Sequence, residues 1–362
     1  MTPVAPTHSE NSAHRATTTP KAFHVMAKPA GARCNLSCDY CFFLAKESLY
    51  PGGSFRMSTE VMESYIRQTI EAHSVPEITI AWQGGEPTLM GLDFYRLAVE
   101  TAERYRKPSV TIRHTIQTNG TLLDDEWCEF LRENRFLVGI SLDGPREMHN
   151  AYRRDKAGQG TFDRVVKAAR LMQRHKVDFN VLCAVHAANS ENPLAVYRFL
   201  RDELEARYYQ FLPIVERVNG DQVTERSVTP ESYGRFLIGI FNEWVRRDVG
   251  RVYVQLFDAM LASRVLGQSS LCMFCETCGV APVVEHNGDL YSCDHFVEPK
   301  HLLGNILRTP LAELLNSDRQ LSFGENKRDT LPRLCRECAF CLNAGESAPR
   351  TVFLRRPTAR AD

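Results

Sequence analysis

Three cysteines lie close together near the N-terminus, in the segment Cys34-Asn35-Leu36-Ser37-Cys38-Asp39-Tyr40-Cys41. Their C-x3-C-x2-C spacing brings three thiolates onto one short loop. A cubane iron–sulfur cluster ordinarily takes four cysteine ligands, so three leave one iron open to bind another molecule. Zinc is the alternative, but structural zinc takes four ligands, usually in C-x2-C pairs, and no histidine or fourth cysteine is nearby. The spacing therefore favours a [4Fe-4S] cluster with one open iron.

The remaining cysteines are also unevenly placed. Of twelve in the chain, four lie at 272–293 and three at 335–341, whereas Cys128 and Cys183 stand alone in apolar segments. We expect those two to be small core residues. The first 22 residues lack the apolar core and cleavage site of a secretory signal, and we predict a disordered tail and a cytoplasmic protein. In a reducing compartment, clustered cysteines indicate metal binding or catalysis rather than disulfides.

Composition and charge exclude several other classes of protein. The 362 residues carry 44 Lys and Arg against 44 Asp and Glu, so the formal net charge is zero. Such a balance favours neither nucleic acid nor an anionic membrane as a partner. We find no apolar run long enough to span a bilayer. The length predicts two domains, or three.

The elements that must position the cysteines alternate between strand and helix up to about residue 245. The candidate strands span residues 23–27, 78–83, 110–117, 137–142, 177–185 and 208–214, and the candidate helices 58–72, 94–106, 124–133, 161–175 and 193–204. Ser58 and Asp124 are suitable helix N-caps. This alternation predicts an α/β fold with a parallel sheet, either open or closed into a barrel. A helical stretch at 230–265 and a hairpin at 283–292 should follow.

Polar and glycine-rich motifs follow several of these strands. They are Gln83-Gly84-Gly85-Glu86-Pro87, Gln117-Thr118-Asn119-Gly120, Ser141-Leu142-Asp143-Gly144-Pro145 with Arg153 beyond it, and residues 210–217. Each motif alone is compatible with an ordinary turn. Glycine lets a ligand approach the backbone closely, because no Cβ intrudes. In a parallel barrel the chemistry lies at the carboxyl ends of the strands, where all four motifs would meet.

The cluster loop resembles that of the radical S-adenosylmethionine (SAM) enzymes, whose open iron chelates the amino acid end of SAM. With the strand-end motifs and the Cys293-Asp294 pair, residues 23–340 resemble the anaerobic sulfatase-maturating enzymes. This resemblance implies a partial (β/α)6 radical SAM barrel at 23–245 and a small SPASM-like iron–sulfur domain at 246–340. By position in the motifs, the residues that match the family's SAM contacts are Tyr40, Gly85, Ser141, Arg153 and Val215.

The resemblance also implies roles for the later cysteines. In this family, a SPASM domain carries two auxiliary [4Fe-4S] clusters, the first bound by Cys272, Cys278 and Cys293 and the second by Cys335 and Cys338. Cys275 is an extra cysteine and by position not a ligand. Asp294 matches the residue that accepts a proton from the substrate, a role that a carboxylate beside a redox cluster suits. An ordinary turn aspartate is the alternative.

The chain departs from the family pattern after Cys338. The SPASM spacing C-x2-C-x5-C-x3-C fails because Ala344 and Ala348 stand where cysteines belong, while Cys341 has the wrong spacing. A single base lost just after the Cys338 codon would explain both replacements, since the shifted frame can encode cysteine near each position. Our hypothesis is that residues 341–362 are an out-of-frame tail. A diverged lineage with degraded auxiliary clusters is the competing hypothesis.

The family's activity is the oxidation of one Ser or Cys of a sulfatase to Cα-formylglycine. The expected partners are an unfolded or nascent sulfatase polypeptide and a reductase such as flavodoxin or ferredoxin. Two alternatives remain open from the sequence. One is another peptide-modifying SPASM enzyme, for example a thioether-forming maturase, and the other is an inactive scaffold whose clusters have decayed.

Overall fold

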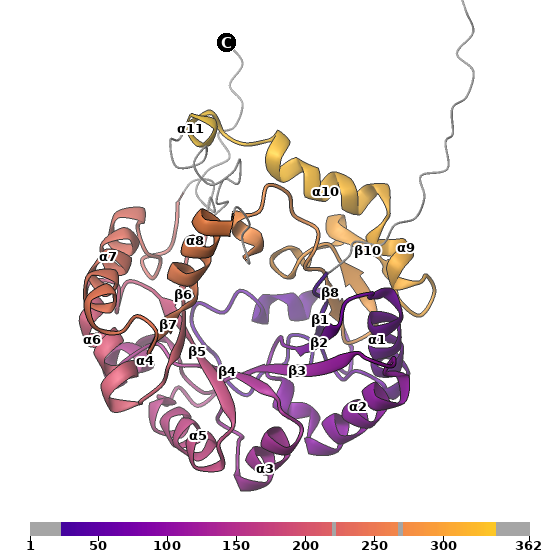
Figure 1. Ribbon diagram of the computed structural model, residues 1–362, viewed down its shortest axis with the longest axis horizontal. Helices are drawn as coiled ribbons and strands as arrows, with labels where there is room; N and C mark the ends of the chain where they lie inside the picture. The colour runs from indigo at the N-terminus through magenta and orange to yellow at the C-terminus, as the bar shows by residue number, and fades with distance from the viewer. Residues whose placement is uncertain (1–22, 219–221, 267–270, 338–362) are drawn as a thin grey trace, which may run out of the picture.

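The computed structural model describes residues 23–218, 222–266 and 271–337 (Figure 1). One curved sheet organises this part of the chain, with the strand order β10-β9-β8-β1-β2-β3-β4-β5-β6-β7. Strands β1 to β7 are parallel, and their bounds are Met26–Lys28, Glu77–Trp82, Thr111–Thr118, Leu137–Ser141, Asp178–Val185, Tyr208–Pro213 and Tyr253–Val254. This arrangement confirms the predicted parallel α/β barrel.

Helices cover the outer side of the curved sheet, as Figure 1 shows for α1, α2, α3 and α5. The helices of this layer are α1 Thr59–Ala72, α2 Leu92–Tyr105, α3 Asp125–Glu133, α4 Arg146–Tyr152, α5 Phe162–His175, α6 Pro193–Arg198, α7 Pro230–Arg247 and α8 Gln255–Leu266. Fully buried side chains such as Ile80, Ile140 and Val181 fill the space between the strands and the helices. Burial of this apolar surface holds the strand ends in fixed positions.

Local signals placed most element boundaries correctly. The predicted N-caps are confirmed, because the Ser58 side chain accepts a hydrogen bond from Val61 N and the Asp124 side chain from Trp127 N. Strands β2 to β6 begin and end within one residue of prediction, whereas β1 begins three residues later than predicted. Cys128 and Cys183 are fully buried, as expected of core residues.

The single helical stretch predicted at 230–265 is wrong. Two helices, α7 and α8, are separated by a turn and by β7. Gly250 has φ +78° in this turn, which a continuing helix does not allow. The Trp244 indole donates to Val252 O at 2.8 Å, and β7 then pairs with β6. Tertiary pairing at the sheet edge therefore outweighs the helical pattern.

The C-terminal elements continue the same sheet rather than forming a separate layer. The predicted hairpin is present as β8 Val283–Glu285 and β9 Asp289–Tyr291, with β10 Leu302–Asn305 beyond it, followed by α9 Leu311–Leu315, α10 Asp318–Asp329 and α11 Arg333–Arg336. Strand β8 pairs in parallel with β1, with Lys28 opposite Glu285. The hairpin is thus joined to the strand that precedes the cluster loop.

No helix among the described residues has both the length and the apolar character needed to cross a membrane. The predicted disordered tail at 1–22 and the predicted out-of-frame tail at 341–362 lie outside the described residues.

Candidate active site

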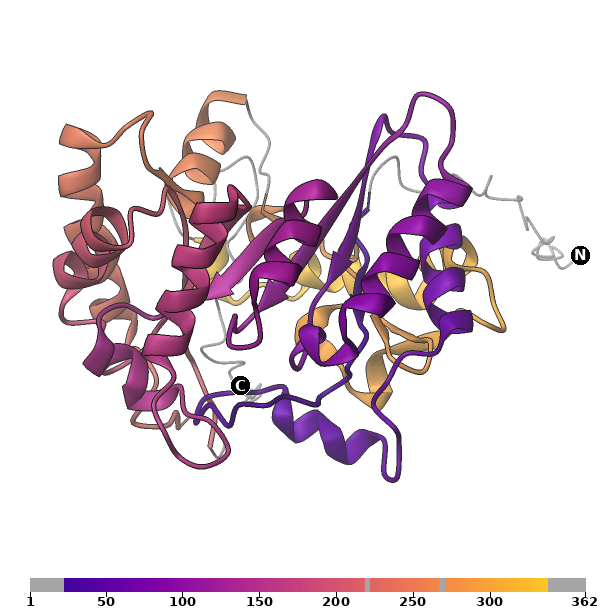
Figure 2. The same cartoon turned by 90° about the horizontal axis from the view of Figure 1, so that it is seen from below.

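The three-cysteine loop directly follows β1 and lies across the carboxyl end of the sheet (Figure 2). Its backbone is fixed to the segment after α4, because Ser37 N donates to Arg154 O at 2.8 Å and Asp39 N to Tyr152 O at 3.0 Å. Leu36, between the first two cysteines, is buried. These contacts fix the loop without any contribution from its thiols.

The thiols of Cys34, Cys38 and Cys41 gather on one side of this loop. Burial raises the pKa of the Cys34 thiol to about 12 and that of Cys38 to about 11, and the negative charges of neighbouring cysteines add to both shifts. The Cys34 sulfur accepts from Leu36 N at 3.3 Å and from Asn119 Nδ2 at 3.7 Å. N–H groups aimed at a cysteine sulfur are typical of iron–sulfur sites, where such hydrogen bonds tune the cluster.

The two glycines after β2 allow the next loop to pass close to the cluster loop. Gly84 and Gly85 have φ of +82° and +47°. A Cβ on Gly85 would lie 2.1 Å from Arg33 O, and one on Gly84 would lie 2.3 Å from the Lys28 side chain. A side chain at either position would displace the segment that carries Cys34. The two glycines therefore allow a tight contact within the chain, and the predicted approach of a ligand to Gly85 stays a prediction.

Glu86 connects the loops after β2 and β3. Its buried carboxylate accepts hydrogen bonds from Thr88 N, Thr88 Oγ1, Thr118 Oγ1 and Asn119 N at 2.6–3.0 Å. Burial raises the pKa of Glu86, and these hydrogen bonds offset only part of that effect. Since Asn119 also contacts the Cys34 sulfur, Glu86 positions a residue of the cluster site.

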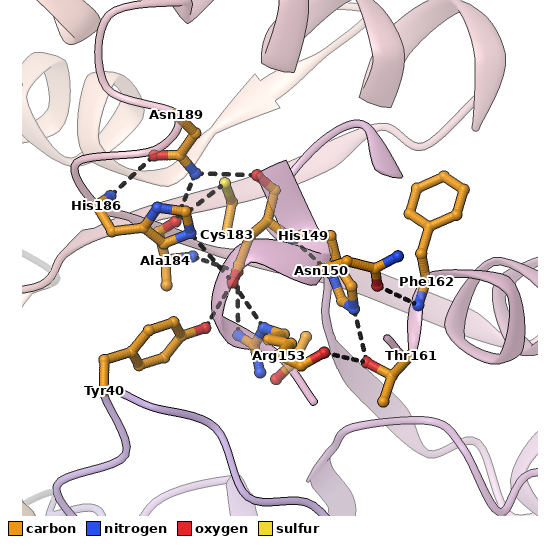
Figure 3. A network of polar contacts seen from close by, with 12 residues as sticks. Tyr40, His149, Asn150, Arg153, Thr161, Phe162, Cys183, Ala184, His186 and Asn189 are labelled. Atoms are coloured by element: carbon orange, nitrogen blue, oxygen red, sulfur yellow. Dashed lines mark hydrogen bonds and ion pairs between the residues drawn. The ribbon is translucent and has the colours of Figure 1, made fainter. Parts of the chain in front are cut away.

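Asp143 is the centre of a polar network after β4. Figure 3 labels Tyr40 and Arg153, two of the residues that contact it. Its buried carboxylate accepts from the Tyr40 hydroxyl at 2.5 Å and from Arg153 Nε and Nη2 at 2.8 and 3.1 Å. Burial favours a raised pKa for Asp143, but the Arg153 charge, the nearby His186 ring and the hydrogen bonds from Arg153 hold that pKa well below its usual value. Asp143 is therefore ionised and joins two of the predicted SAM contacts, Tyr40 and Arg153.

The other predicted SAM contacts also lie at strand ends. Ser141 is the last residue of β4, and its hydroxyl accepts from Gln117 Nε2 at 3.1 Å. Val215 follows β6 and packs, partly buried, against the main core. Together with Tyr40 after β1, Gly85 after β2 and Arg153 after α4, the five predicted contacts come from four βα units. The carboxyl edge of the sheet collects them, as the barrel topology requires.

The later cysteines form a second group beside the hairpin. Cys272 begins a short 3-10 turn, Cys272–Phe274, Cys278 N donates to Gly324 O at 3.1 Å, and Cys293 follows β9. The thiols of Cys272 and Cys278 lie near enough to Cys293 to contribute to raising its pKa, which burial and these neighbours bring to about 12. The three predicted ligands of the first auxiliary cluster are therefore brought together.

Lys327 of α10 stabilises the backbone of this second group of cysteines. Its buried ammonium donates to Cys272 O at 2.7 Å, to Met273 O at 3.1 Å and also to Cys275 O. These hydrogen bonds stabilise the buried positive charge of Lys327 and fix the backbone turn that carries Cys272. The side chain of Cys275 is directed to its own turn, at 3.5 Å from Leu271 O.

Asp294 is buried, not a surface turn residue. Its carboxylate forms an ion pair with Lys28, the last residue of β1, and the Lys28 ammonium also lies 4.0 Å from the centre of the Phe43 ring. Burial acts to raise the pKa of Asp294, but the Lys28 charge outweighs it, so the pKa is lowered. Asp294 is therefore ionised, and it lies beside the end of β1, the strand that leads into the cluster loop.

Two further contacts join the cluster loop to the auxiliary region. Phe42 stacks on His295 with ring centres 6.0 Å apart, and the hydroxyls of Tyr50 and Tyr291 are 2.7 Å apart. Together with the β1–β8 pairing, they fix the position of Asp294 relative to the three-cysteine loop. The two regions belong to one site.

Comparison with known proteins identifies the family. The radical SAM superfamily profile matches residues 29–200, and that of the SPASM iron–sulfur cluster-binding domain matches residues 272–339. The chain is 42% identical, over 351 residues, to a serine-type anaerobic sulfatase-maturating enzyme of Bacteroides thetaiotaomicron, covering 92% of this chain and 84% of that protein. This chain belongs to the anaerobic sulfatase-maturating enzyme family. It is a radical SAM enzyme with an oxidoreductase type of reaction.

Other members of the family show how far the likeness extends. A cysteine-type anaerobic sulfatase-maturating enzyme of Clostridium perfringens is 35% identical over 338 residues, covering 90% of each chain. The solved structure "Native anSMEcpe with bound AdoMet and Cp18Cys peptide" is 34% identical, with a TM-score of 0.82 over 90% of this chain and 88% of that one. The fold of this family therefore extends through both regions of the site.

The cysteine geometry is compatible with the clusters of this family. No three His, Cys, Asp or Glu side chains among the described residues are arranged to hold a metal ion. A cubane makes a different demand, because each cysteine binds a separate iron at a corner of the cluster. The loop at 34–41 supplies three neighbouring thiols with N–H groups facing one of them, which fits that demand. For the second auxiliary cluster, Cys335 lies in α11, while Cys338 is outside the described residues.

Several residues important to this sulfatase-maturating site were not singled out from the sequence. Asp143 and Glu86 lie inside motifs that the sequence analysis did select, so proximity to glycine was the available signal. Lys28 precedes a proline at a strand end, and Lys327 lies in a strongly polar helix, with no local mark of burial. Both lysines are recognisable only from the three-dimensional contacts.

Proposed function

We propose that this chain oxidises an active-site Ser or Cys of a sulfatase to Cα-formylglycine. The observation that carries the proposal is the buried, ionised Asp294, paired with Lys28 at the end of β1 and adjacent to Cys293. A carboxylate in this position can accept a proton beside both cysteine groups. The family membership supports the same reaction.

The roles of the first group follow from its geometry. Cys34, Cys38 and Cys41 would hold a [4Fe-4S] cluster, and Tyr40, Gly85, Ser141, Arg153 and Val215 would bind SAM. When bound there, this cluster and SAM supply the 5′-deoxyadenosyl radical that takes a hydrogen atom from the substrate Cβ. Arg153 offers a guanidinium for the SAM carboxylate, and Gly85 lets its loop pack closely against the segment that carries Cys34. SAM-bound relatives of the same fold support this assignment.

Asp294 then completes the oxidation. After loss of the Cβ hydrogen, a serine substrate must lose its hydroxyl proton and one electron to become an aldehyde. We assign the proton to the Asp294 carboxylate, and Cys272, Cys278 and Cys293 would hold an auxiliary cluster that would supply the electron acceptor. A cysteine substrate would lose its thiol proton in the same way and give a thioaldehyde, which water converts to the aldehyde. Lys28 keeps Asp294 ionised before this step.

The substrate is an extended stretch of an unfolded or nascent sulfatase polypeptide. The solved relative with a bound peptide supports a peptide ligand for this chain also. A reductase such as flavodoxin or ferredoxin would supply the electron that activates SAM. Clustered cysteines suit a reducing compartment, and we propose the cytoplasm as the location.

Replacing Asp294 with Asn tests the function. The reconstituted chain is incubated anaerobically with SAM, dithionite and a Cys-Thr-Pro-Ser-Arg-type peptide or its serine counterpart, and products are identified by mass. We expect Asp294→Asn to cleave SAM but to lose aldehyde formation about a hundredfold or more. Asp289→Asn, on the hairpin strand β9, is the matched control. Aldehyde retained by Asp294→Asn would refute the role, and a crosslinked peptide would indicate a thioether-forming maturase.

A further inference from the structure

We propose that Asp143 is a positioning residue for SAM: it fixes Arg153 and Tyr40 relative to each other and so couples the SAM site to the cluster loop. The inference rests on the proposed function only for the assignment of Tyr40 and Arg153 to SAM. It does not require that the substrate be a sulfatase peptide. Nothing in the reaction outlined above uses Asp143.

The first argument is the set of donors that converge on one carboxylate. Asp143 is fully buried, and its two oxygens accept four hydrogen bonds: from the Tyr40 hydroxyl, from two Arg153 nitrogens and from Ala184 N at 2.9 Å. His186 Nε2 lies 3.6 Å from Oδ2. A carboxylate with this many donors has little freedom to move. Both residues that it holds are therefore held firmly.

The second argument is the place of Tyr40. It lies between Cys38 and Cys41 in sequence, and its hydrogen bond to Asp143 spans 103 positions of the chain. Its ring is enclosed by Tyr152, with centres 6.2 Å apart, and by His186, with centres 5.7 Å apart. Figure 3 shows Tyr40 reaching from the cluster loop toward the residues of the later strands. Asp143 thus ties the middle of the cluster loop to the end of β4.

The third argument concerns Arg153. A guanidinium has five N–H groups, and Asp143 takes two of them in a fork. The same guanidinium lies beside Cys38, where its charge and hydrogen bond lower the thiol pKa against the effect of burial. An N–H group that contacts neither Asp143 nor Cys38 can face a carboxylate such as that of SAM. Asp143 fixes the plane of the guanidinium, and so decides where those groups point.

The backbone of Asp143 is itself held in place by hydrogen bonds. Asn189 Nδ2 donates to Asp143 O at 2.9 Å and to Ala184 O at 2.8 Å, and Asp143 N donates to His149 Nδ1 at 3.3 Å. His149 in turn contacts Thr161 Oγ1 at 2.9 Å, and that hydroxyl donates to Arg153 O at 3.1 Å. The network therefore closes on both the side chain and the backbone of Arg153. This closure is what a positioning residue requires.

Asp143→Asn is the decisive variant. The amide keeps the size of the side chain but replaces one acceptor oxygen with a donor, which must face Tyr40, Arg153 or Ala184 N. We expect the SAM dissociation constant and the KM for SAM in peptide-free cleavage to rise about tenfold or more. The maximal rate of cleavage at saturating SAM should change much less, since the proposed role of Asp143 is exerted on SAM binding through Tyr40 and Arg153. A residue with a purely structural role would not raise the KM for SAM while leaving the maximal rate of cleavage nearly unchanged.

The chain offers a matched control at Asp248. This buried aspartate also accepts from a tyrosine and an arginine, Tyr197 at 2.7 Å and Arg201 at 2.8 Å, but it lies after α7. Asp248→Asn should lower stability without changing the affinity for SAM. Equal weakening of SAM binding in both variants would overturn the proposal. So would Asp143→Asn with a SAM dissociation constant within twofold of the unmodified chain.

A second variant covers the case in which Asp143→Asn does not fold. Tyr40→Phe removes only the hydroxyl that Asp143 accepts, and the ring stays in place. We expect a smaller rise in the SAM dissociation constant, about threefold to tenfold, and no change would overturn the proposal. An unmodified chain that binds no SAM would refute this inference and the proposed function together. A chain that cleaves SAM but makes no aldehyde would refute only the function.

Discussion

Lys28 and Asp294 form a buried ion pair between the end of β1 and the turn after β9. The pairing exists because β8 adds in parallel to β1, which brings the auxiliary hairpin beside the strand that leads into the cluster loop. The Lys28 ammonium therefore contacts the ring of Phe43, just after the cluster loop, and also pairs with the carboxylate of Asp294, the proposed proton acceptor. Lys28 is the residue through which the two cysteine groups share a single site.

Lys28→Met should abolish the oxidation while leaving SAM cleavage in place. Without the ammonium, burial outweighs the smaller effect of His295 and raises the pKa of Asp294, so less of the carboxyl group is ionised and able to accept a proton. We expect formylglycine formation to fall about a hundredfold or more. An unpaired buried charge also costs about 3–5 kcal/mol of stability. Aldehyde formation by mass and thermal unfolding measure the two effects.

The double variant Lys28→Met with Asp294→Asn separates these effects. Removing both charges should recover much of the lost stability, but not the activity. Lys300→Met serves as the control, because this lysine side chain is 70% exposed and its partner is a surface glutamate. Full aldehyde formation by Lys28→Met would contradict the assignment.

Gly85→Ala should disrupt the cluster loop. A methyl group there meets Arg33 O at 2.1 Å, whereas one on Gly158, which shares a positive φ of +76°, meets nothing within 4 Å. Both substitutions carry the backbone cost of alanine in a left-handed conformation, about 1 kcal/mol. Only Gly85→Ala should also lose SAM cleavage and iron at the first cluster. Equal effects of the two substitutions on SAM cleavage would show that the close approach is unimportant.

The sequence predicted the parts of this fold that depend on local pattern. Apolar alternation located strands β2 to β6, and cysteine spacing located the cluster loop at the carboxyl end of β1. The carboxyl edge then follows from the parallel topology, which is why Gly85, Ser141 and Arg153 could be assigned to one site.

Other features depend on contacts between distant segments. The break at Asp248 follows from the pairing of β7 with β6, and the burial of Lys28 follows from the pairing of β8 with β1. Neither strand pairing can be recognised from the local sequence. Lys327 resembles an ordinary surface lysine in a polar helix, yet it lies beneath the Cys272 turn. Buried charges of this kind can be recognised only once the segments that surround them are placed.

Lys327→Met should loosen the turn that carries Cys272. The variant leaves the carbonyls of Cys272, Met273 and Cys275 without their donor, at a cost of about 2–3 kcal/mol. We expect a lower midpoint in urea and faster alkylation of Cys272 and Cys278, followed by peptide mass mapping. Lys46→Met, at a half-buried lysine in the short helix Leu44–Leu49 after the cluster loop, is the control. Unchanged alkylation rates would contradict the anchoring role.

His114 should make the barrel sensitive to mild acid. Burial lowers its pKa to about 4 from 6.5, and its ring stacks on Phe136 at 4.9 Å in the core. The unfolded chain takes up a proton below pH 6.5, whereas the folded chain does not until about pH 4. This histidine therefore contributes a loss of about 2 kcal/mol of stability between pH 7 and pH 5. His114→Phe should flatten that part of the stability curve, measured by urea unfolding, and an unchanged slope would refute the account.

The auxiliary cysteines should limit the iron that this chain can carry. Cys34, Cys38 and Cys41 suffice for one cubane of the SAM type, whereas Ala344 and Ala348 remove two thiolates from the auxiliary pattern. We expect anaerobic reconstitution to give about four irons at the first cluster and less than two full auxiliary cubanes. Replacing Cys34, Cys38 and Cys41 together with Ala should remove about four irons and all SAM cleavage. Cys128→Ala, in the core, should remove none.

Restoring the two missing thiolates tests directly whether their absence limits the iron that the chain can carry. The pair Ala344→Cys and Ala348→Cys recreates the x5 and x3 spacings after Cys338, in a part of the chain outside the described residues. A thiolate-deficient cluster is labile because metal affinity and the folding of a small metal domain are coupled. The restored chain should therefore gain iron and hold it longer against a chelator, and aldehyde formation should rise with it. Three full cubanes in the unmodified chain would show that other ligands complete the auxiliary sites.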